Sequence, residues 1–266
     1  MSLRIDMHVH TVHSGDSWLD PAAVVRIAKA RGLDGVAVTD HGTIRGGVKA
    51  RDANSDPKFR VIVGAEYATE FGHVVGLFLT REPDLEHVQG RRLEYARVVE
   101  AVHQQGGVAV LAHPFQVRRD LADQAFAGPV TVDCIETMNA RATAARNPRA
   151  NAEAAEFADR HGIPRVGCSD AHLAREIGHG LTWFEGLEPG AADADIKRAL
   201  LVGEGTPLGT TSPRIVIPLS QVARMCVRHE YGQAPRVLAR LVLTALGPLG
   251  LAIENRLRGA IREDVD

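Results

Sequence analysis

The sequence predicts an α/β fold in which mostly parallel strands, covered by helices, close into a distorted (β/α) barrel of seven units. Short apolar runs alternate with amphipathic stretches of helical periodicity up to about residue 204, a pattern typical of parallel sheets flanked by helices. Nearly every apolar run also ends in a histidine or a carboxylate. In a parallel barrel these strand ends meet at one rim, so we expect one site there. A doubly wound open sheet, which would spread the side chains along a line, is the second choice.

The first strand, at 4–10, carries His8 and His10 on the same face, because side chains alternate along a strand. Two imidazoles on one edge can chelate a metal ion. Later strands end in further candidate ligands, which are Asp40, His41, Glu66, His113, Asp170 and His172.

The remaining elements follow from apolar runs and from helix start and stop signals, such as Asp20-Pro21 before one helix and Gly106 after another. The expected strands are 4–10, 34–39, 60–65, 73–79, 108–112, 132–136, 165–169 and 181–184. The expected helices are 20–32, 43–54, 85–105, 151–161, 191–202, 219–229 and 235–261. We therefore expect a barrel over 1–204 and an extra C-terminal helical segment over 205–266, which packs on the barrel or forms a homo-oligomer contact.

Composition is that of a globular protein, with 45% hydrophobic and 24% charged residues. A net charge of -2 argues against bulk binding of long duplex nucleic acid or anionic membranes. The three cysteines form no CxxC pair, and the first residues lack the apolar core of a signal peptide. The uncharged run at 241–253 is too short to span a bilayer. We expect a cytoplasmic protein without a transmembrane segment.

The candidate ligands mix nitrogen and carboxylate oxygen without thiolate, which suits zinc, manganese or iron. They are too many for one tetrahedral ion, so two or three divalent ions that share a bridging carboxylate fit better.

Several motifs, taken in chain order, resemble those of the PHP (polymerase and histidinol phosphatase) superfamily over about residues 3–185. The motifs are Ile5-Asp6-Met7-His8-Val9-His10-Thr11, Val38-Thr39-Asp40-His41, Gly64-Ala65-Glu66, His73-Val74-Val75-Gly76, Ala112-His113-Pro114 and Gly167-Cys168-Ser169-Asp170-Ala171-His172. The resemblance implies a distorted seven-unit barrel, a trinuclear metal centre and phosphoester hydrolysis.

The resemblance also implies a ligand set. One ion would take His8, His10, Glu66 and Asp170; a second Glu66, His73 and His113; a third Asp16, His41 and His172. The ligand in the first loop can be histidine or aspartate, and we favour Asp16 over His13. Glu66 would link two ions.

The metals imply the chemistry. A divalent ion lowers the pKa of bound water from about 15.7 toward about 7, so a metal-activated hydroxide would attack phosphorus. The expected substrate is a small phosphomonoester or phosphodiester, such as a nucleotide, a short oligonucleotide or a sugar phosphate. Asp40 is expected to fix a loop. A metal-bound water or a rim histidine such as His172 could protonate the leaving group. The candidate phosphate clamps are Arg45, Arg118, Arg119 and Arg141.

Two other functions stay open. An amidohydrolase-like enzyme that cleaves a C–N bond also uses His-x-His on its first strand, but it expects a lysine as the bridge. A non-catalytic, metal-binding regulatory domain would use the tail as a partner contact. The segment from His73 to His113 lacks the extra helical insert of nucleoside-monophosphate phosphatases, and no Gly-Ser-Val-His segment of histidinol phosphatases is present.

Overall fold

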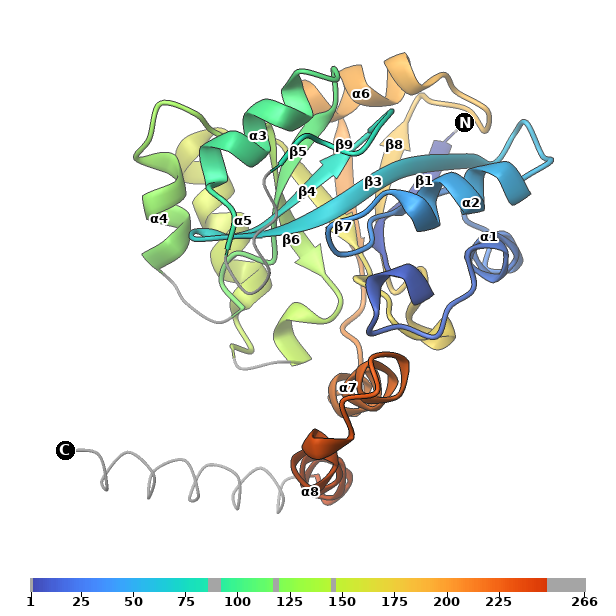
Figure 1. Cartoon of the computed structure of the whole chain (residues 1–266). Helices are drawn as coiled ribbons and strands as arrows, with labels where there is room; N and C mark the ends of the chain where they lie inside the picture. The colour runs from blue at the N-terminus through green and yellow to red at the C-terminus, as the bar shows by residue number, and fades with distance from the viewer. Residues whose placement is uncertain (1, 86–91, 117–119, 145–146, 248–266) are drawn as a thin grey trace.

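The computed structural model describes residues 2–85, 92–116, 120–144 and 147–247 (Figure 1). The strands are β1 (Ser2–Val9), β2 (Gly35–Val38), β3 (Arg60–Thr69), β4 (Gly72–Leu77), β5 (Val108–Ala112), β6 (Cys134–Asn139), β7 (Arg165–Cys168), β8 (Gly180–Glu185) and β9 (Gly205–Gly209). The α-helices are α1 (Pro21–Ala30), α2 (Arg45–Ala53), α3 (Tyr95–His103), α4 (Asp120–Phe126), α5 (Ala150–His161), α6 (Asp193–Leu201), α7 (Val216–Val227) and α8 (Ala234–Ala245). Short 3-10 turns are η1 (Val12–Ser14), η2 (Ala142–Ala144), η3 (Ala174–Glu176) and η4 (Tyr231–Gln233).

The strands form one nine-stranded sheet in the order β7-β6-β5-β4-β3-β2-β1-β8-β9. Its two ends approach each other, because a Cβ atom on Gly167 of β7 would lie 2.9 Å from the Cα atom of Pro207 in β9. The sheet is therefore a nearly closed, distorted barrel, and the predicted fold class is confirmed. The strands are less uniformly parallel than expected, since β3, β4 and β5 pair antiparallel, as do β1, β8 and β9.

The barrel interior is an apolar core that leaves one end for polar side chains. Leu3, Ile5 and Met7 of β1 lie in this core, and Ile196 and Leu200 of α6 pack against it. The Cys134 thiol, at the start of β6, contacts the Leu200 carbonyl oxygen at 3.8 Å. Helix α6 therefore fills the amino end of the parallel strands. The carboxyl end stays open to the loops that follow them.

Two expectations about local structure differ from the observed elements. The helix expected over 85–105 is described only as α3, which begins where the Tyr95 amide donates to the Glu70 carboxylate at 2.8 Å. Residues 86–91 lie outside the described residues. The proline-rich link contains strand β9, where Pro207 is tolerated because β9 is the last strand in the sheet order. The sheet thus continues past residue 204.

After β9, the C-terminal segment continues with α7, whose Val216 and Ala223 are buried. Figure 1 shows α7 at the end of the barrel where β1 leads into η1, with α8 beyond it. The helix expected over 235–261 is observed as α8, which ends at Ala245 before a turn at residues 246 and 247. Residues 248–261 lie outside the described residues. Among residues that the structure describes, no helix is long and apolar enough to cross a bilayer.

Candidate metal centre

The structure brings the predicted ligands together at the carboxyl ends of the parallel strands. Four compact groups form within the described residues, each with ligand atoms within 4.8 Å of one another. One of them, His8, Glu136 and Cys168, includes residues outside the predicted ligand set. The other three, which consist of predicted ligands, are His10, Asp16, His41 and His172; His8, His10 and Glu66; and Glu66, His73 and His113. Asp170 joins them, because its Oδ1 lies 3.4 Å from His10 Nε2.

The deepest group lies at the end of β1. The Nε2 atoms of His8 and His10 face each other at 2.9 Å, and both side chains are fully buried. Glu66 Oε2 lies 3.5 Å from His8 Nε2 and 3.4 Å from His10 Nε2. Two nitrogens and a carboxylate oxygen therefore converge on one point, with His8 and His10 on the same face of the strand.

Glu66 lies between two of the groups. Its Oε1 atom lies 2.6 Å from His73 Nδ1 and 3.1 Å from His113 Nε2. Its Oε2 atom faces the buried histidines and lies 2.9 Å from His41 Nδ1. One carboxylate thus offers one oxygen to each side, which is the geometry that a bridging ligand needs.

Asp16 completes the third group. Its Oδ2 atom lies 3.2 Å from His41 Nε2 and 3.3 Å from His172 Nε2. Its Oδ1 atom is buried and has no hydrogen-bond partner. His13, the other candidate in this loop, lies outside the three groups. An unpartnered buried carboxylate oxygen among imidazoles is unfavourable unless a cation is present.

The electrostatics of the cluster fit divalent cations. Burial, together with the neighbouring His172 and His41, lowers the pKa of His10 to about 3, so its imidazole is neutral. Burial opposes ionisation of Glu66, but His73, His41 and His8 outweigh it and hold the pKa of Glu66 well below its usual range. Neutral imidazoles and ionised carboxylates are the donor set of zinc, manganese and iron sites.

Two of the proposed ligands, His8 and His41, carry protons that a metal ion would have to displace. Burial lowers the pKa of His8, but the carboxylates of Glu136, Glu66 and Asp170 outweigh burial and hold this pKa well above its usual range. Burial lowers the pKa of His41, but the carboxylates of Glu66 and Asp16 outweigh burial and raise this pKa to about 10. Metal binding at such a site releases protons, so its affinity falls as the pH falls.

Two residues that the sequence reasoning missed orient the buried histidines. Glu136 Oε1 accepts from His8 Nδ1 at 2.7 Å, and Ser14 Oγ lies 2.8 Å from His10 Nδ1. Each contact leaves the Nε2 atom of its histidine facing the cluster. Glu136 ends an expected strand, as Glu66 does, so the same strand-end signal pointed to it. The loop serine carried no such signal.

Asp40 faces away from the cluster and holds the first loop. Its carboxylate accepts from the backbone N–H of Thr11 at 2.5 Å and from the Thr11 hydroxyl at 2.8 Å. Burial raises the pKa of Asp40 to about 6, although these two hydrogen bonds lower it. Gly46 leaves the room that Asp40 needs, because a Cβ atom at Gly46 would overlap the carboxylate.

The predicted arginine clamps differ in what they contact. Arg141 is 4% exposed, and its Nη2 atom donates to Ser220 Oγ at 2.7 Å, so its guanidinium is engaged within the protein. Arg45 is exposed at the start of α2. Arg118 and Arg119 lie outside the described residues.

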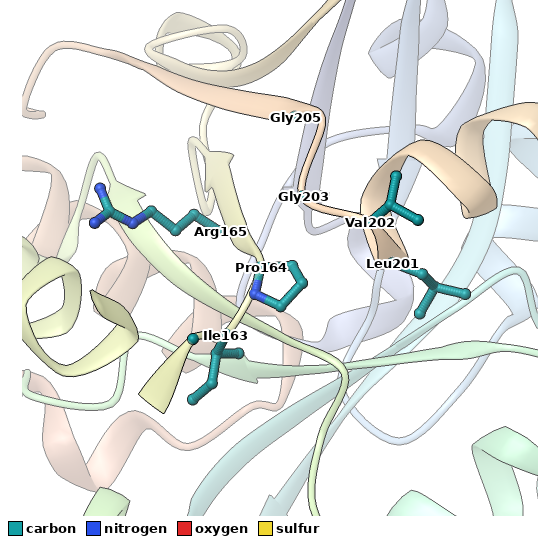
Figure 2. Close-up of a pocket in the computed structure, with 8 residues that line it drawn as sticks. Ile163, Pro164, Arg165, Leu201, Val202, Gly203 and Gly205 are labelled. Carbon is teal, nitrogen blue, oxygen red and sulfur yellow. The ribbon is translucent and has the colours of Figure 1, made fainter. Parts of the chain in front are cut away.

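A separate pocket lies at the opposite end of the barrel (Figure 2). Ile163 and Pro164, just before β7, line it together with Leu201 and Val202 at the end of α6. None of the candidate ligands lines this pocket.

Comparisons with known sequences agree with the motifs. The PHP domain profile matches residues 6–163, and a PHP-associated profile matches residues 148–204. An uncharacterized protein of Methanocaldococcus jannaschii, MJ1587, is 32% identical over 149 residues, which cover 52% of this chain and 82% of that protein.

Solved structures share the fold at low identity. A two-domain protein from Bacteroides vulgatus, described as containing a predicted PHP-like metal-dependent phosphoesterase, superposes with a TM-score of 0.61 at 20% identity. The match covers 79% of this chain and 65% of that one. An amidohydrolase from Chromobacterium violaceum, with bound sulfate and no metal, has a TM-score of 0.51 at 19% identity over 73% of this chain and 96% of that one. The profile match, the barrel and the rim of histidines and carboxylates together place this chain in the PHP domain family.

Proposed function

We propose that the chain is a metal-dependent phosphoesterase that hydrolyses a small phosphomonoester or phosphodiester at the barrel rim. Two or three divalent ions would occupy the three groups, and Glu66 would be shared between two of them. The observation that carries the proposal is the placement of Glu66, whose two oxygens face different groups of histidines. Membership of the PHP family supports metal-dependent hydrolysis, and the Bacteroides vulgatus relative is described as a predicted phosphoesterase.

The proposed ligands differ in burial, and we expect the buried and the exposed ligands to have different roles. His8, His10 and Asp170 would hold one ion in the buried floor of the site, where little solvent enters. His41 and His73, with side chains 31% and 36% exposed, lie where a substrate could approach. Bound ions would supply Lewis acidity, which activates water and neutralises charge on the phosphoryl oxygens.

His172 fits a ligand better than a proton donor. Its Nδ1 atom lies 2.9 Å from the Asp170 carbonyl oxygen. A carbonyl oxygen only accepts, so the proton of neutral His172 is held on Nδ1. The Nε2 atom then presents its lone pair toward Asp16, at 3.3 Å.

Cleavage of a C–N bond is the competing chemistry. It would require a lysine near the bridging position, and the lysines of this chain are Lys29, Lys49, Lys58 and Lys197. Lys29 Nζ lies 2.8 Å from Asn54 Oδ1, and Lys197 Nζ donates to the Gly106 carbonyl oxygen at 2.8 Å. The carboxylate of Glu66 faces two groups of histidines and would serve as the bridge instead. A glutamate rather than a lysine at the proposed bridge therefore supports phosphoester hydrolysis over C–N cleavage.

The test is an activity screen of the purified full chain with added Mn²⁺. Phosphomonoesters, phosphodiesters and amides are offered in parallel, together with the variants His8→Ala and Asp170→Asn. We expect turnover of one phosphoester class and a loss of at least about a hundredfold in each variant, since even residues outside the ligand set cost ten- to a hundredfold.

A matched histidine serves as control. His103 on α3 pairs with Asp133 at 2.8 Å on the protein surface, so His103→Ala should keep wild-type activity. Turnover of amides alone, or full activity in both ligand variants, would reject the proposal.

A further inference from the structure

Helix α7 lies against the rim that carries the candidate ligands, although it is outside the matched family region. Both matched profiles end at or before residue 204, whereas α7 spans Val216–Val227. The helix is thus an addition to the barrel of the family. Its contacts with the barrel converge on two loops that carry proposed ligands.

The first contact is made by Arg228, directly after α7. Its Nη2 atom donates to the Ser14 carbonyl oxygen at 3.0 Å, and its Nε atom donates to the Gly15 carbonyl oxygen at 3.2 Å. These two carbonyl groups directly precede Asp16. Ser14 Oγ also lies 2.8 Å from His10 Nδ1 and accepts from the backbone N–H of His41, so the clamped segment leads into Asp16 and contacts two further proposed ligands.

Gly15 allows the close approach of Arg228. Its φ angle is 78°, and a Cβ atom there would lie 2.7 Å from Arg228 Nε. The loop therefore turns its carbonyl groups toward the end of α7, and a side chain at Gly15 would displace the guanidinium. The loop and the helix fit each other at this point.

The second contact joins the start of α7 to the loop after β7. Arg141 Nη2 donates to Ser220 Oγ at 2.7 Å, and its Nη1 atom lies 3.5 Å from the Asp170 carbonyl oxygen. Its Nε atom lies 3.4 Å from Glu176 Oε1, and the Glu176 carboxylate in turn accepts from the backbone N–H of His172 at 3.2 Å. Arg141 thus connects α7 to both ligands of the β7 loop.

We infer that α7 is a positioning element of the metal centre, and that Arg228 and Arg141 hold the Asp16 loop and the Asp170–His172 loop in register with each other. Asp16 must meet His172 across this gap, and their contact is 3.3 Å. A helix tied to both loops fixes that distance, so both arginines would act through the ligands that they position. The inference rests on the proposed metal-dependent function.

The experiment measures metal affinity and loop protection in the full chain, without substrate. Mn²⁺ binding is followed by calorimetry, and hydrogen exchange is followed in peptides that cover residues 11–19. The variants are Arg228→Ala, Arg228→Lys and Ser220→Ala. The control is Arg224→Ala, an exposed arginine of the same helix that pairs with Glu230 at 3.4 Å.

We expect Arg228→Ala to bind Mn²⁺ about tenfold more weakly, at the low end of the range for residues that orient ligands, because Arg228 is exposed. Its loop should exchange faster even without metal. Arg228→Lys should recover part of the affinity through one carbonyl contact, and Ser220→Ala should weaken binding while the exchange of residues 11–19 stays unchanged.

Equal Mn²⁺ affinity in Arg228→Ala and the wild type would overturn the inference and leave the proposed function intact. Equal losses in Arg228→Ala and Arg224→Ala would also overturn it, because they would indicate a general effect of the helix. A wild-type protein that binds no Mn²⁺ would instead reject the proposed function. Thermal unfolding of each variant shows that the compared proteins are folded.

Discussion

The contact between Glu136 and His8 gives a sharp test of how the buried ligands are oriented. Glu136 accepts three hydrogen bonds, from His8 Nδ1 at 2.7 Å, the His113 backbone N–H at 2.9 Å and Asn139 Nδ2 at 2.8 Å. Both of its oxygens are therefore occupied by donors. In Glu136→Gln, the new amide NH₂ group must face at least one of these donors, whichever way the side chain is oriented.

The cost can be worked out from these contacts. A buried donor left without an acceptor costs about 1–3 kcal/mol. The substitution also removes a negative charge beside a proposed metal ligand. The unpaired donor lowers the unfolding free energy of the metal-free and the metal-bound protein alike. Loss of the residue that orients a metal ligand costs about ten- to a hundredfold in metal affinity, so we expect Glu136→Gln to bind Mn²⁺ more weakly by that factor.

The assay is calorimetric titration of the metal-stripped variant with Mn²⁺, together with thermal unfolding. The control is Glu156→Gln, which makes the same substitution at an exposed glutamate that pairs with Arg149 at 3.3 Å. We expect the control to match the wild type. If Glu136→Gln binds Mn²⁺ within about twofold of the wild type, the orienting role of Glu136 is wrong, because residues with that role cost at least tenfold.

Three further predictions follow from packing and metal linkage. Gly46→Ala should lower the unfolding free energy by about 1–3 kcal/mol in chemical denaturation, because the added methyl group overlaps the Asp40 carboxylate. Gly128→Ala is the control, and its unfolding free energy should be unchanged, because nothing lies near the new methyl group. Of the three thiols, Cys134 and Cys168 are buried with raised pKa values, so an aromatic disulfide reagent should modify only Cys226 in the native protein and all three after denaturation. At a concentration about a hundredfold above its Kd, Mn²⁺ should stabilise the fold by about 2.7 kcal/mol and raise the melting temperature. EDTA should return the melting temperature to that of the metal-free protein. An unchanged melting temperature on addition of Mn²⁺ would argue against metal binding to the folded state.

The floor of the site was predictable from the sequence because its signals are local. His8 and His10 share a face because side chains alternate along a strand with a period of two residues. Glu66 directly follows the apolar run at 60–65. The convergence of strand ends in a barrel then brings distant residues together. The structure places these three side chains in one buried group, as the sequence predicts.

The supporting contacts were not predictable because they depend on long-range geometry. Arg141 carries the sequence signal of a phosphate clamp in a rim loop, yet Ser220 and the other groups that engage it come from distant parts of the chain. The start of α3 is similar, since the Glu70 carboxylate that accepts from the Tyr95 amide belongs to the turn after β3. No pattern along the sequence of either segment carries this information.

Strand β9 shows a further limit of sequence reasoning. Pro207 argues against a strand when the neighbours are unknown, because proline lacks the N–H group that a central strand must donate. In the structure, β9 pairs only with β8 in the sheet order, so the missing donor is tolerated. The prediction of an irregular link failed because the position of a strand within a sheet is a tertiary property.

The central claim is that the rim groups hold divalent ions around Glu66. An anomalous difference map from crystals grown with Mn²⁺, recorded at the manganese absorption edge, tests it most directly. The account predicts at least two peaks within the three groups, with Glu66 in contact with both. Manganese bound elsewhere, or a single ion that does not contact Glu66, would contradict it.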